Sequence, residues 1–386
     1  MVVSIVPQLN ARRIGIVGGG QLALMMGEAA GALGLETLVL ATTDDDPAVA
    51  SCDYVLVGEP RDANALDELA RSVDVVTFDH ELVDLEQIAT LERRGFTVRP
   101  SSSALHFSVD KAYQRRRFFE AGLPVPRFVV VTSSSDPTLA AFLDELDAEP
   151  VLKASRGGYD GRGVLFPQTR EETLTMIDQL ASLGEVLIEE RLELQSEVAQ
   201  LLARGVDGSV ALYPLVTTTQ ANGMCVEVIY PAQVTADIAR RGEELAEQVA
   251  SLVDAVSIVA IEYFVTAKGL LVNEIALRPH NSGHWTIEGT STSQFTNHLL
   301  AVSGQSLGTV APLFAHAVMV NVVGSEQPGS LERARAVRDV AVHDYGKSWR
   351  PNRKLGHVTS VGDDPTTAHV RAWQGARAYG TSTEEA

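Results

Sequence analysis

The sequence predicts a protein of the α/β and α+β classes, with a parallel sheet in its N-terminal part. Short apolar strands alternate with helices through the first 100 residues, a rhythm that is typical of a doubly wound parallel sheet. Strands dominate from residue 193 onward, which favours an α+β C-terminal part. At 386 residues the chain is too long for one compact core, so two or three domains are expected.

The N-terminal elements follow from apolar runs separated by turn residues. The first run leads directly into Gly18-Gly19-Gly20, and the second ends in an acidic turn that closes at Pro47. The expected elements are strands at 14–18, 37–41, 55–57 and 73–78, with helices at 21–33 and 63–72. The first domain is expected to end near Pro100.

A small α+β unit and a strand-rich region are expected next. The helix that contains Arg115-Arg116-Arg117 is interpreted as having a solvated basic face. Beyond it, the expected elements are strands at 151–154 and 186–189 and helices at 171–183 and 236–256.

The charge balance excludes some classes of partner. Fifty acidic residues against 31 basic ones give a formal net charge of −19. Such a surface repels nucleic acid and anionic membranes, so neither is an expected partner. Cys52 and Cys225 alone provide no disulfide framework. The sequence shows neither a secretory signal nor an apolar run of about 20 residues, and a cytoplasmic location is expected.

The glycine turn after the first strand matches a dinucleotide-binding fingerprint. Gly18-x-Gly20-x-x-Ala23 opens a helix, and acids at 44–46 lie where a ribose hydroxyl would be held. A lone match is weak, because such a turn needs glycines for close packing with or without a cofactor. The free amides of a helix N-terminus favour any anion. A bound phosphate is therefore a better interpretation than a nicotinamide dinucleotide.

A second glycine-rich segment follows Lys153. This lysine ends a strand, and four glycines lie between residues 157 and 163. An ammonium group and backbone amides can thus surround a polyphosphate. The segment is not a Walker A loop, and a mobile β-hairpin is the alternative. The interleaved Tyr159, Asp160 and Arg162 favour a phosphate-binding lid that closes over the reacting groups.

Charged residues after the next strand allow two interpretations. Glu189-Glu190-Arg191-Leu192 and Glu197 could form a surface charge cluster. Because they follow a phosphate-binding loop by one strand, they could instead be an adenine-binding hinge and a ribose-binding acid.

The segment 273–285 indicates a phosphoryl-transfer site. Glu262 and Glu274 leave adjacent apolar strands, so their carboxylates can hold a hard cation together with substrate phosphates. Arg278, four residues past the second acid, lies where an anion would meet this metal.

Two histidines in this segment are spaced as zinc ligands on a helix. His280 and His284 lie four residues apart, but Pro279 and Gly283 argue against a helix and no third ligand is evident. Contacts of His280 and Asn281 with a substrate are favoured over a zinc site.

A basic cluster near the C-terminus is unusual in so acidic a chain. Four cations lie within eight residues, at Lys347, Arg350, Arg353 and Lys354. The cluster indicates either an anion site or a basic hairpin with no role.

Together these motifs resemble those of the 5-(carboxyamino)imidazole ribonucleotide synthases, a family of ATP-grasp ligases in purine biosynthesis. The resemblance covers nearly the whole chain, with the motifs in order. They are Gly18 to Leu22, Gly157-Gly158-Tyr159-Asp160-Gly161, Arg278 to Trp285, Ser293-Gln294-Phe295 and Lys354-Leu355-Gly356-His357. It implies an ATP-grasp fold with a Rossmann-like N-terminal domain (1–108), a small central lid domain (109–190) and a mixed α+β C-terminal domain (191–386).

The family's reaction implies the substrates, cofactors and assembly. It is the ATP-dependent carboxylation of 5-aminoimidazole ribonucleotide by bicarbonate, which gives the N5-carboxy product, ADP and phosphate. ATP would bind with Mg²⁺, or with Mn²⁺ as the alternative, and a homodimer is common. The implied metal ligands are Glu262 and Glu274. The implied ATP-binding residues are Lys111, Lys153, Gly158, Tyr159, Asp160, Gly161, Arg162, Gly163, Val164, Glu189, Glu190, Arg191, Leu192, Glu197, Gln220, Asn273 and Glu274.

The resemblance also implies the residues around the ribonucleotide and bicarbonate. The substrate-binding set is Gln21, Tyr159, His280, Asn281, Ser282, Lys347, Arg353 and Lys354. Asp160, Arg278 and Lys347 are the candidate catalytic residues, with Asp160 assisting removal of the amine proton.

The sequence departs from the family pattern at several positions. Lys111 stands where an arginine is usual, which keeps the charge but loses the planar fork. Gln220 stands where a histidine often contacts the nucleotide. The segment Thr77-Phe78-Asp79-His80-Glu81 replaces a version richer in glutamate.

Three alternative functions remain open at this point. Another ATP-grasp ligase, such as the formate-dependent glycinamide ribonucleotide transformylase, is disfavoured by the Tyr159-Asp160 loop and the 280–285 run. A dehydrogenase would explain the glycines at 18–20 alone. An inactive nucleotide-binding regulator would have no need of Lys153 and the two acids.

Overall fold

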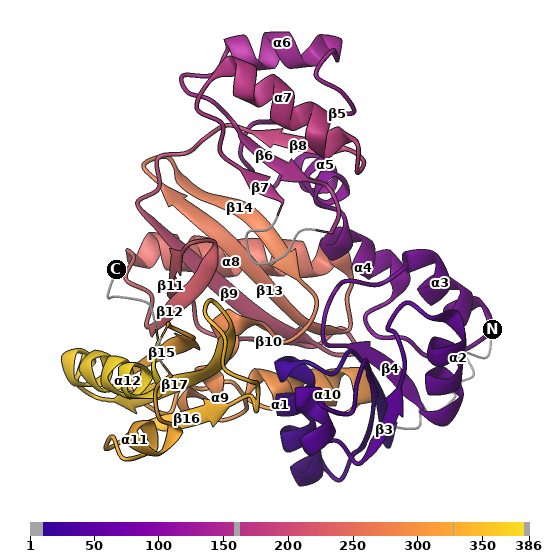
Figure 1. Cartoon of the computed structure of the whole chain (residues 1–386), viewed down its shortest axis with the longest axis vertical. Helices are drawn as coiled ribbons and strands as arrows, with labels where there is room; N and C mark the ends of the chain where they lie inside the picture. Colours follow the sequence, from indigo (N-terminus) through magenta and orange to yellow (C-terminus); the bar gives the residue numbers. More distant parts are fainter. Residues whose placement is uncertain (1–10, 158–162, 327, 382–386) are drawn as a thin grey trace, which may run out of the picture.

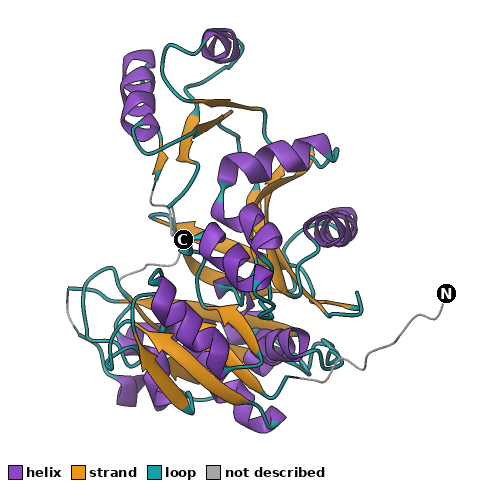
Figure 2. Cartoon of the chain, turned by 90° about the vertical axis from the view of Figure 1, so that its right-hand side faces the viewer, coloured by secondary structure: helices purple, strands orange, loops and turns teal. Residues whose placement is uncertain are grey.

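Three β-sheets organise the protein. The computed structural model describes residues 11–157, 163–326 and 328–381, which hold two four-stranded sheets and one nine-stranded sheet. The small central sheet and its helices project away from the other two parts of the molecule (Figures 1 and 2). The predicted combination of α/β and α+β architecture is confirmed.

The N-terminal sheet is parallel, with strand order β3-β2-β1-β4. Alternate residues of β1 enter different cores: Ile14 and Ile16 pack with α1, whereas Val17 packs with α2 and α3. Helices therefore cover both faces, as a doubly wound sheet requires. The elements are β1 (Arg13–Val17), α1 (Gln21–Ala30), β2 (Glu36–Ala41), β3 (Tyr54–Val57), α2 (Ala63–Ser72), β4 (Val75–Phe78) and α3 (Leu85–Arg93).

The central part is a four-stranded antiparallel sheet with order β5-β8-β6-β7. Asp110 joins it to the preceding helices, because its carboxylate caps α5 at the Tyr113 amide and accepts from the Ser155 hydroxyl at 2.5 Å. The start of α5 is thus fixed beside the end of β6. The elements are α4 (Ser102–Val109), α5 (Lys111–Glu120), β5 (Phe128–Val131), α6 (Pro137–Asp144), β6 (Val151–Ala154), β7 (Val164–Leu165), α7 (Arg170–Ala181) and β8 (Val186–Glu189).

The nine-stranded sheet dominates the C-terminal half. Its strands follow the order β14-β13-β9-β11-β12-β15-β17-β16, with β10 paired to β9. The strands are β9 (Ser196–Arg204), β10 (Val210–Leu212), β11 (Val216–Ala221), β12 (Met224–Tyr230), β13 (Ser257–Thr266), β14 (Gly269–Ala276), β15 (His316–Val323), β16 (Ala341–Asp344) and β17 (Lys354–Gly362). The helices are α8 (Ala236–Val253), α9 (Thr286–Gly289), α10 (Gln294–Ser303), α11 (Leu331–Arg335) and α12 (Pro365–Tyr379).

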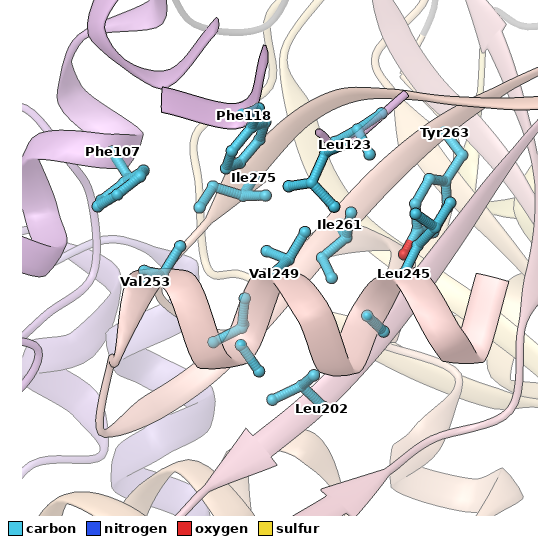
Figure 3. Close-up of a cluster of buried hydrophobic side chains, with 14 of the residues drawn as sticks. Phe107, Phe118, Leu123, Leu202, Leu245, Val249, Val253, Ile261, Tyr263 and Ile275 are labelled. Atoms are coloured by element: carbon cyan, nitrogen blue, oxygen red, sulfur yellow. The ribbon is translucent and has the colours of Figure 1, made fainter. Parts of the chain in front are cut away.

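Helix α8 covers one face of β9, β13 and β14. Thr235 caps its first turn, and its apolar residues Leu245 and Val249 pack on Ile261 and Leu202 of the sheet (Figure 3). Each fully buried aliphatic side chain contributes roughly 1.5–3 kcal/mol. Since this core holds one face of β13 and β14, the charged residues Glu262 and Glu274 of these strands point to the opposite face.

Helix α10 joins the N-terminal sheet to the large sheet. Phe295 and Leu299 share a core with Ile14 and Ile16 of β1. His298 on the same helix contacts the Thr77 hydroxyl through Nε2 at 2.8 Å and accepts from the Ile258 amide through Nδ1 at 3.3 Å. The two parts are therefore joined by a common interior, which fixes the residues that face each other between them.

Candidate active site

An irregularity in β14 places two consecutive polar side chains on one face. Glu262 pairs with Glu274, but Tyr263 pairs with Val272, so Asn273 is an extra residue in the ladder. Val272 and Ile275 both enter the α8 core. Such a bulge lets the two residues between them share the opposite face. The predicted acids and their neighbouring amide are thereby brought together.

Two predicted phosphate-binding lysines meet this acidic group. The Lys111 ammonium group bonds to the Glu274 carboxylate. Lys153 donates to Asn273 Oδ1 at 3.0 Å and pairs with Glu189 at 2.7 Å. Residues from α5, β6, β8 and β14 thus converge on one charged cluster.

The two acids differ in their affinity for protons. Burial raises the pKa of Glu262, and the nearby charges of Glu274 and Glu197 raise it further. Burial also acts to raise the pKa of Glu274, but the charges of Lys111, Lys153 and His280 together outweigh it, and the net pKa is lowered. Glu262 therefore holds the proton more readily than Glu274, as expected for two carboxylates that share a buried site.

The donor atoms of this cluster fit a hard divalent cation. Two carboxylates and an amide oxygen are the ligands that Mg²⁺ takes in proteins. Among the described residues, no group of three or more His, Cys, Asp and Glu side chains is placed to hold a metal ion. A cation at Glu262 and Glu274 would therefore share its remaining positions with substrate oxygens or water.

The structure corrects the prediction that Arg115 lies on a solvated helix face. Its side chain is only 2% exposed and pairs with Glu189 at 2.5 Å. It also donates to the carbonyl oxygens of Val272 and Asn273, at 2.7 and 2.8 Å. The interpretation was wrong because α5 docks against β8 and β14. Arg116 does lie on the surface, paired with Glu185.

The remaining predicted nucleotide-binding residues lie mostly along β7, β8 and β9. Val164 pairs with Lys153 across the small sheet, and the Gly163 carbonyl accepts from the Ala154 amide. Glu190 pairs with Arg127 at 3.1 Å, and Glu197 lies near Lys153, with its pKa raised by burial. Arg191 and Leu192 follow β8 after Glu190. Gly158, Tyr159, Asp160, Gly161 and Arg162 lie outside the described residues.

A cavity of about 1060 Å³ lies between the N-terminal sheet and the large sheet. It is lined by side chains from both parts, including the acidic pair and part of the basic cluster. The predicted site residues that line it are Gln21, Lys111, Gln220, Glu262, Glu274, Arg278, His280, Asn281 and Lys354.

Arg278 is held by an acid that the sequence analysis did not select. Its Nε donates to Glu81 at 2.6 Å, and one terminal nitrogen donates to the Pro279 carbonyl at 3.1 Å. Glu81 lies just beyond β4 and lines the same cavity. The position of Glu81 in the sequence could have identified it, because ligands of parallel sheets bind beyond the carboxyl ends of the strands.

His280 is fixed from both sides. Its Nδ1 lies 2.8 Å from the Ser282 hydroxyl, and its Nε2 lies 3.6 Å from Glu262. Ser282 is 1% exposed, so it supports the imidazole ring. Gln294 accepts from the His280 amide and donates to its carbonyl. The backbone turn at 280–283 is thus held by α10.

The basic cluster divides between the cavity and the surface. Lys347 donates to Gln21 at 2.5 Å, which joins two predicted substrate-binding residues from opposite ends of the chain. Lys354 lines the cavity. Arg353 instead donates to the hydroxyl and carbonyl of Ser348, at 2.8 and 3.2 Å.

The glycine turn at α1 is occupied by the protein's own carboxylates. Asp79 is buried, and burial raises its pKa overall although the nearby Gly20 and Ala23 amides act to lower it. A Cβ on Gly20 would lie 2.6 Å from Asp79 Oδ2, and one on Gly19 would lie 2.7 Å from the Asp46 side chain. The glycines thus allow these acids to approach, which explains the glycine pattern by packing without a bound dinucleotide.

This packing predicts a steric penalty at Gly20. Gly20→Ala is expected to lower the free energy of unfolding by about 1–3 kcal/mol, the usual cost of overpacking. Gly31→Ala is the matched control, since its Cβ would meet nothing within 4 Å and its backbone is helical. Urea unfolding of both variants checks this, and equal stabilities would show that the Asp79 contact is not tight.

Three family models match the chain in succession. They are the ribonucleotide synthetase preATP-grasp domain at residues 11–108, the ATP-grasp domain at 116–295 and the phosphoribosylaminoimidazole carboxylase C-terminal domain at 317–371. No helix among the described residues is long and apolar enough to cross a membrane.

Curated relatives and solved structures agree with these matches. The N5-carboxyaminoimidazole ribonucleotide synthase of Mycobacterium tuberculosis is 42% identical over 369 residues, covering 93% of this chain and 86% of the relative. That of Corynebacterium ammoniagenes is 38% identical, covering 91% and 88%. The N5-carboxyaminoimidazole ribonucleotide synthetase of Thermus thermophilus matches with a TM-score of 0.87 at 34% identity, over 97% of this chain and 99% of that one.

A further structure, from Aspergillus clavatus, was solved with ADP and 5-aminoimidazole ribonucleotide. It matches with a TM-score of 0.85 at 26% identity, over 96% of this chain and 99% of that one. The predicted ATP-grasp fold is confirmed. From the sequence identity and the shared length, this chain belongs to the N5-carboxyaminoimidazole ribonucleotide synthase family.

Proposed function

We propose that this protein carboxylates 5-aminoimidazole ribonucleotide with bicarbonate at the expense of ATP, giving N5-carboxyaminoimidazole ribonucleotide, ADP and phosphate in purine biosynthesis. The observation that carries this proposal is the meeting of the Glu262–Glu274 pair with Lys111 and Lys153 beside a cavity that also contains Arg278. Family membership at 42% identity over nearly the whole chain supports the same reaction.

The first step activates bicarbonate. A bicarbonate oxygen attacks the γ-phosphorus of ATP, ADP leaves, and carboxyphosphate forms. Lys111 and Lys153 would neutralise the charge that develops on the phosphoryl oxygens, a role that their place beside Glu274 and Glu189 supports. Glu262 and Glu274 would hold magnesium, or manganese as the alternative, which supplies further neutralisation of that charge.

The second step forms the carbon–nitrogen bond. The exocyclic amine of the ribonucleotide attacks the carboxyl carbon, the C–O bond to phosphate breaks, and the amine loses a proton. Arg278 can hold the carboxylate in a bidentate manner, and Glu81 keeps its guanidinium group oriented. Asp160 is the proposed proton acceptor, within a Tyr159-Asp160 loop that would exclude water from the carboxyphosphate.

The ribonucleotide would lie at the N-terminal side of the cavity. Gln21 with Lys347, and Lys354 close by, offer a neutral amide and two cations for a ribose phosphate. His280 and Asn281 also line the cavity, and His280 lies 3.6 Å from Glu262 of the acidic pair. The phosphate and the reacting amine can therefore be held at the same time.

A direct assay tests this function. ADP release is measured with MgATP and bicarbonate, with and without 5-aminoimidazole ribonucleotide. We expect strong stimulation only when both substrates are present. Stimulation by formate and glycinamide ribonucleotide instead would assign the protein to the competing ATP-grasp reaction.

The orientation of Arg278 predicts a further effect. Glu81→Gln removes the charge that holds the guanidinium group, so kcat is expected to fall about ten- to a hundredfold. Glu36→Gln is the matched control, because Glu36 also pairs with an arginine at 2.6 Å but on the exposed surface. Steady-state kinetics check this, and equal kcat values for the two variants would remove Glu81 from the mechanism.

The assembly and the location are also proposals. We infer a homodimer in the cytoplasm from the resemblance to the family and from the phosphorylated, water-soluble substrates. Light scattering at micromolar concentration measures the assembly directly, and a mass near 41.4 kDa would show a monomer instead.

A further inference from the structure

A buried asparagine lies behind the cavity wall, next to Asn281. Asn321 is completely buried in β15, near the middle of the large sheet. Its neighbours Val320 and Val322 enter the apolar core on the other face. A buried amide is costly unless its hydrogen-bonding groups are satisfied. Its position therefore requires specific partners.

Those partners fix the orientation of the Asn321 amide. Its Nδ2 donates to the Cys225 carbonyl at 2.8 Å. A carbonyl oxygen accepts only, so the NH₂ group must face Cys225 and the oxygen must face the other way. The common ambiguity between the two ends of an asparagine side chain is thereby resolved.

The fixed amide in turn orients Asn281. Asn321 Nδ2 donates to Asn281 Oδ1 at 2.6 Å, and Asn281 Nδ2 donates to Asn321 Oδ1 at 3.0 Å. Such a reciprocal pair uses one N–H of Asn281, and the amide has a second. Because Asn281 lines the cavity, that second N–H is the group it can offer to a ligand.

The surroundings of Asn321 make this arrangement rigid. Asn321 pairs in register with His357 of β17, and His357 pairs with His343 of β16. The His357 ring is fully buried and stacks on the His284 ring, with 4.8 Å between the ring centroids. Its Nδ1 lies 2.8 Å from the Tyr345 hydroxyl. Asn321 therefore has little freedom to turn, and Asn281 is held through it.

We propose that Asn321 is a positioning residue that fixes Asn281 as a hydrogen-bond donor to an oxygen of the ribonucleotide. The proposal rests on the proposed function and extends it to a residue that does not line the cavity. Because the orientation of the Asn281 amide is fixed before binding, no side-chain entropy is lost when the ribonucleotide binds. This favours affinity for the ribonucleotide over competing ligands.

A double-mutant cycle tests the proposal. Asn281→Ala, Asn321→Leu and the double variant are compared with the unchanged protein, with 5-aminoimidazole ribonucleotide varied at saturating MgATP and bicarbonate. Each single substitution is expected to lower kcat/KM for the ribonucleotide about tenfold, with KM for ATP unchanged. The double variant is expected to be no worse than Asn281→Ala alone, since Asn321 acts through Asn281.

Two further variants separate positioning from a loss of structure. Asn297→Leu removes another fully buried amide, bonded to Tyr213 and Gly308, and should lower stability without changing ribonucleotide kinetics. Asn321→Asp keeps the size but cannot donate to Cys225 or Asn281, so it should lower kcat/KM for the ribonucleotide as Asn321→Leu does. Unchanged ribonucleotide kinetics in both Asn321 variants would overturn the proposal.

The outcomes distinguish this proposal from the function on which it rests. If the protein without substitutions shows no ribonucleotide-dependent activity, the proposed carboxylation is refuted. The same cycle in urea unfolding would then still test the amide pair, and additive stabilities would refute the pairing. An active protein with additive kinetic losses would refute the positioning role alone.

Discussion

Lys153→Met is expected to lower kcat/KM for ATP about a thousandfold. Lys153 is 7% exposed, and its ammonium group lies between Glu189 and the Asn273 amide. In a buried site a preset charge acts on the transferring phosphoryl group with little screening, and its removal costs about 10²–10³ in rate. Weaker binding of the ATP phosphates adds to this loss.

The fold should survive this substitution. Glu189 keeps its pair with Arg115 at 2.5 Å, and methionine retains most of the volume of the lysine stem. Lys268→Met is the matched control, because Lys268 is exposed in the turn between β13 and β14. A Lys153→Met enzyme within threefold of the control in kcat/KM for ATP would exclude a phosphate-binding role.

Acid is expected to destabilise the protein well before most carboxylates are protonated. His284, His298 and His357 are completely buried, and burial lowers the pKa of each, that of His298 to about 3. Their folded pKa values lie below the unfolded value of about 6.5, so only the unfolded chain takes up these protons as the pH falls. Stability is therefore lost below pH 6.5, by about 1.4 kcal/mol per histidine per pH unit.

Buried acids work in the opposite direction over the same range, because burial raises the pKa of Glu262, Asp79 and Glu197. The raised pKa of Glu262, about 8, means that the folded protein holds a proton that the unfolded chain releases above about pH 4.5. Glu262 alone offsets roughly one histidine, and Asp79 and Glu197 offset more, so a net loss below about 3 kcal/mol per pH unit is expected. Urea unfolding between pH 6.5 and 5 measures that slope.

A single substitution isolates the histidine contribution. His298→Gln removes one titrating ring between Thr77 and Ile258, and it should reduce the pH slope by about 1.4 kcal/mol per pH unit whatever its effect on stability. An unchanged slope in this variant would show that His298 is not kept neutral by burial.

The parallel N-terminal sheet was predictable because its signals are local. Apolar strands alternate with helices over short distances, and each turn is marked by Gly, Pro or Asp. The long amphipathic helix was predicted at 236–256 and is observed at Ala236–Val253, because its pattern lies within one segment. The meeting of Glu262 with Glu274 was likewise expected, since their strands are adjacent in the chain.

Other parts of the site depend on pairing that no local pattern encodes. Simple alternation would put Asn273 and Glu274 on opposite faces, and only the extra residue in β14 brings them together. Arg115 is buried because α5 docks on two strands far away in the sequence. Glu81 and Asn321 are single polar residues whose partners lie 197 and 40 positions away. Such contacts become visible only in the folded chain.

We propose that ATP activates bicarbonate as carboxyphosphate. Bicarbonate labelled with ¹⁸O, supplied with MgATP and 5-aminoimidazole ribonucleotide, allows a direct test. An oxygen of bicarbonate attacks the γ-phosphorus and stays on phosphate when the C–O bond breaks, so ³¹P NMR should show one ¹⁸O in the phosphate released. Unlabelled phosphate, formed together with ADP, would show that bicarbonate does not attack the γ-phosphorus.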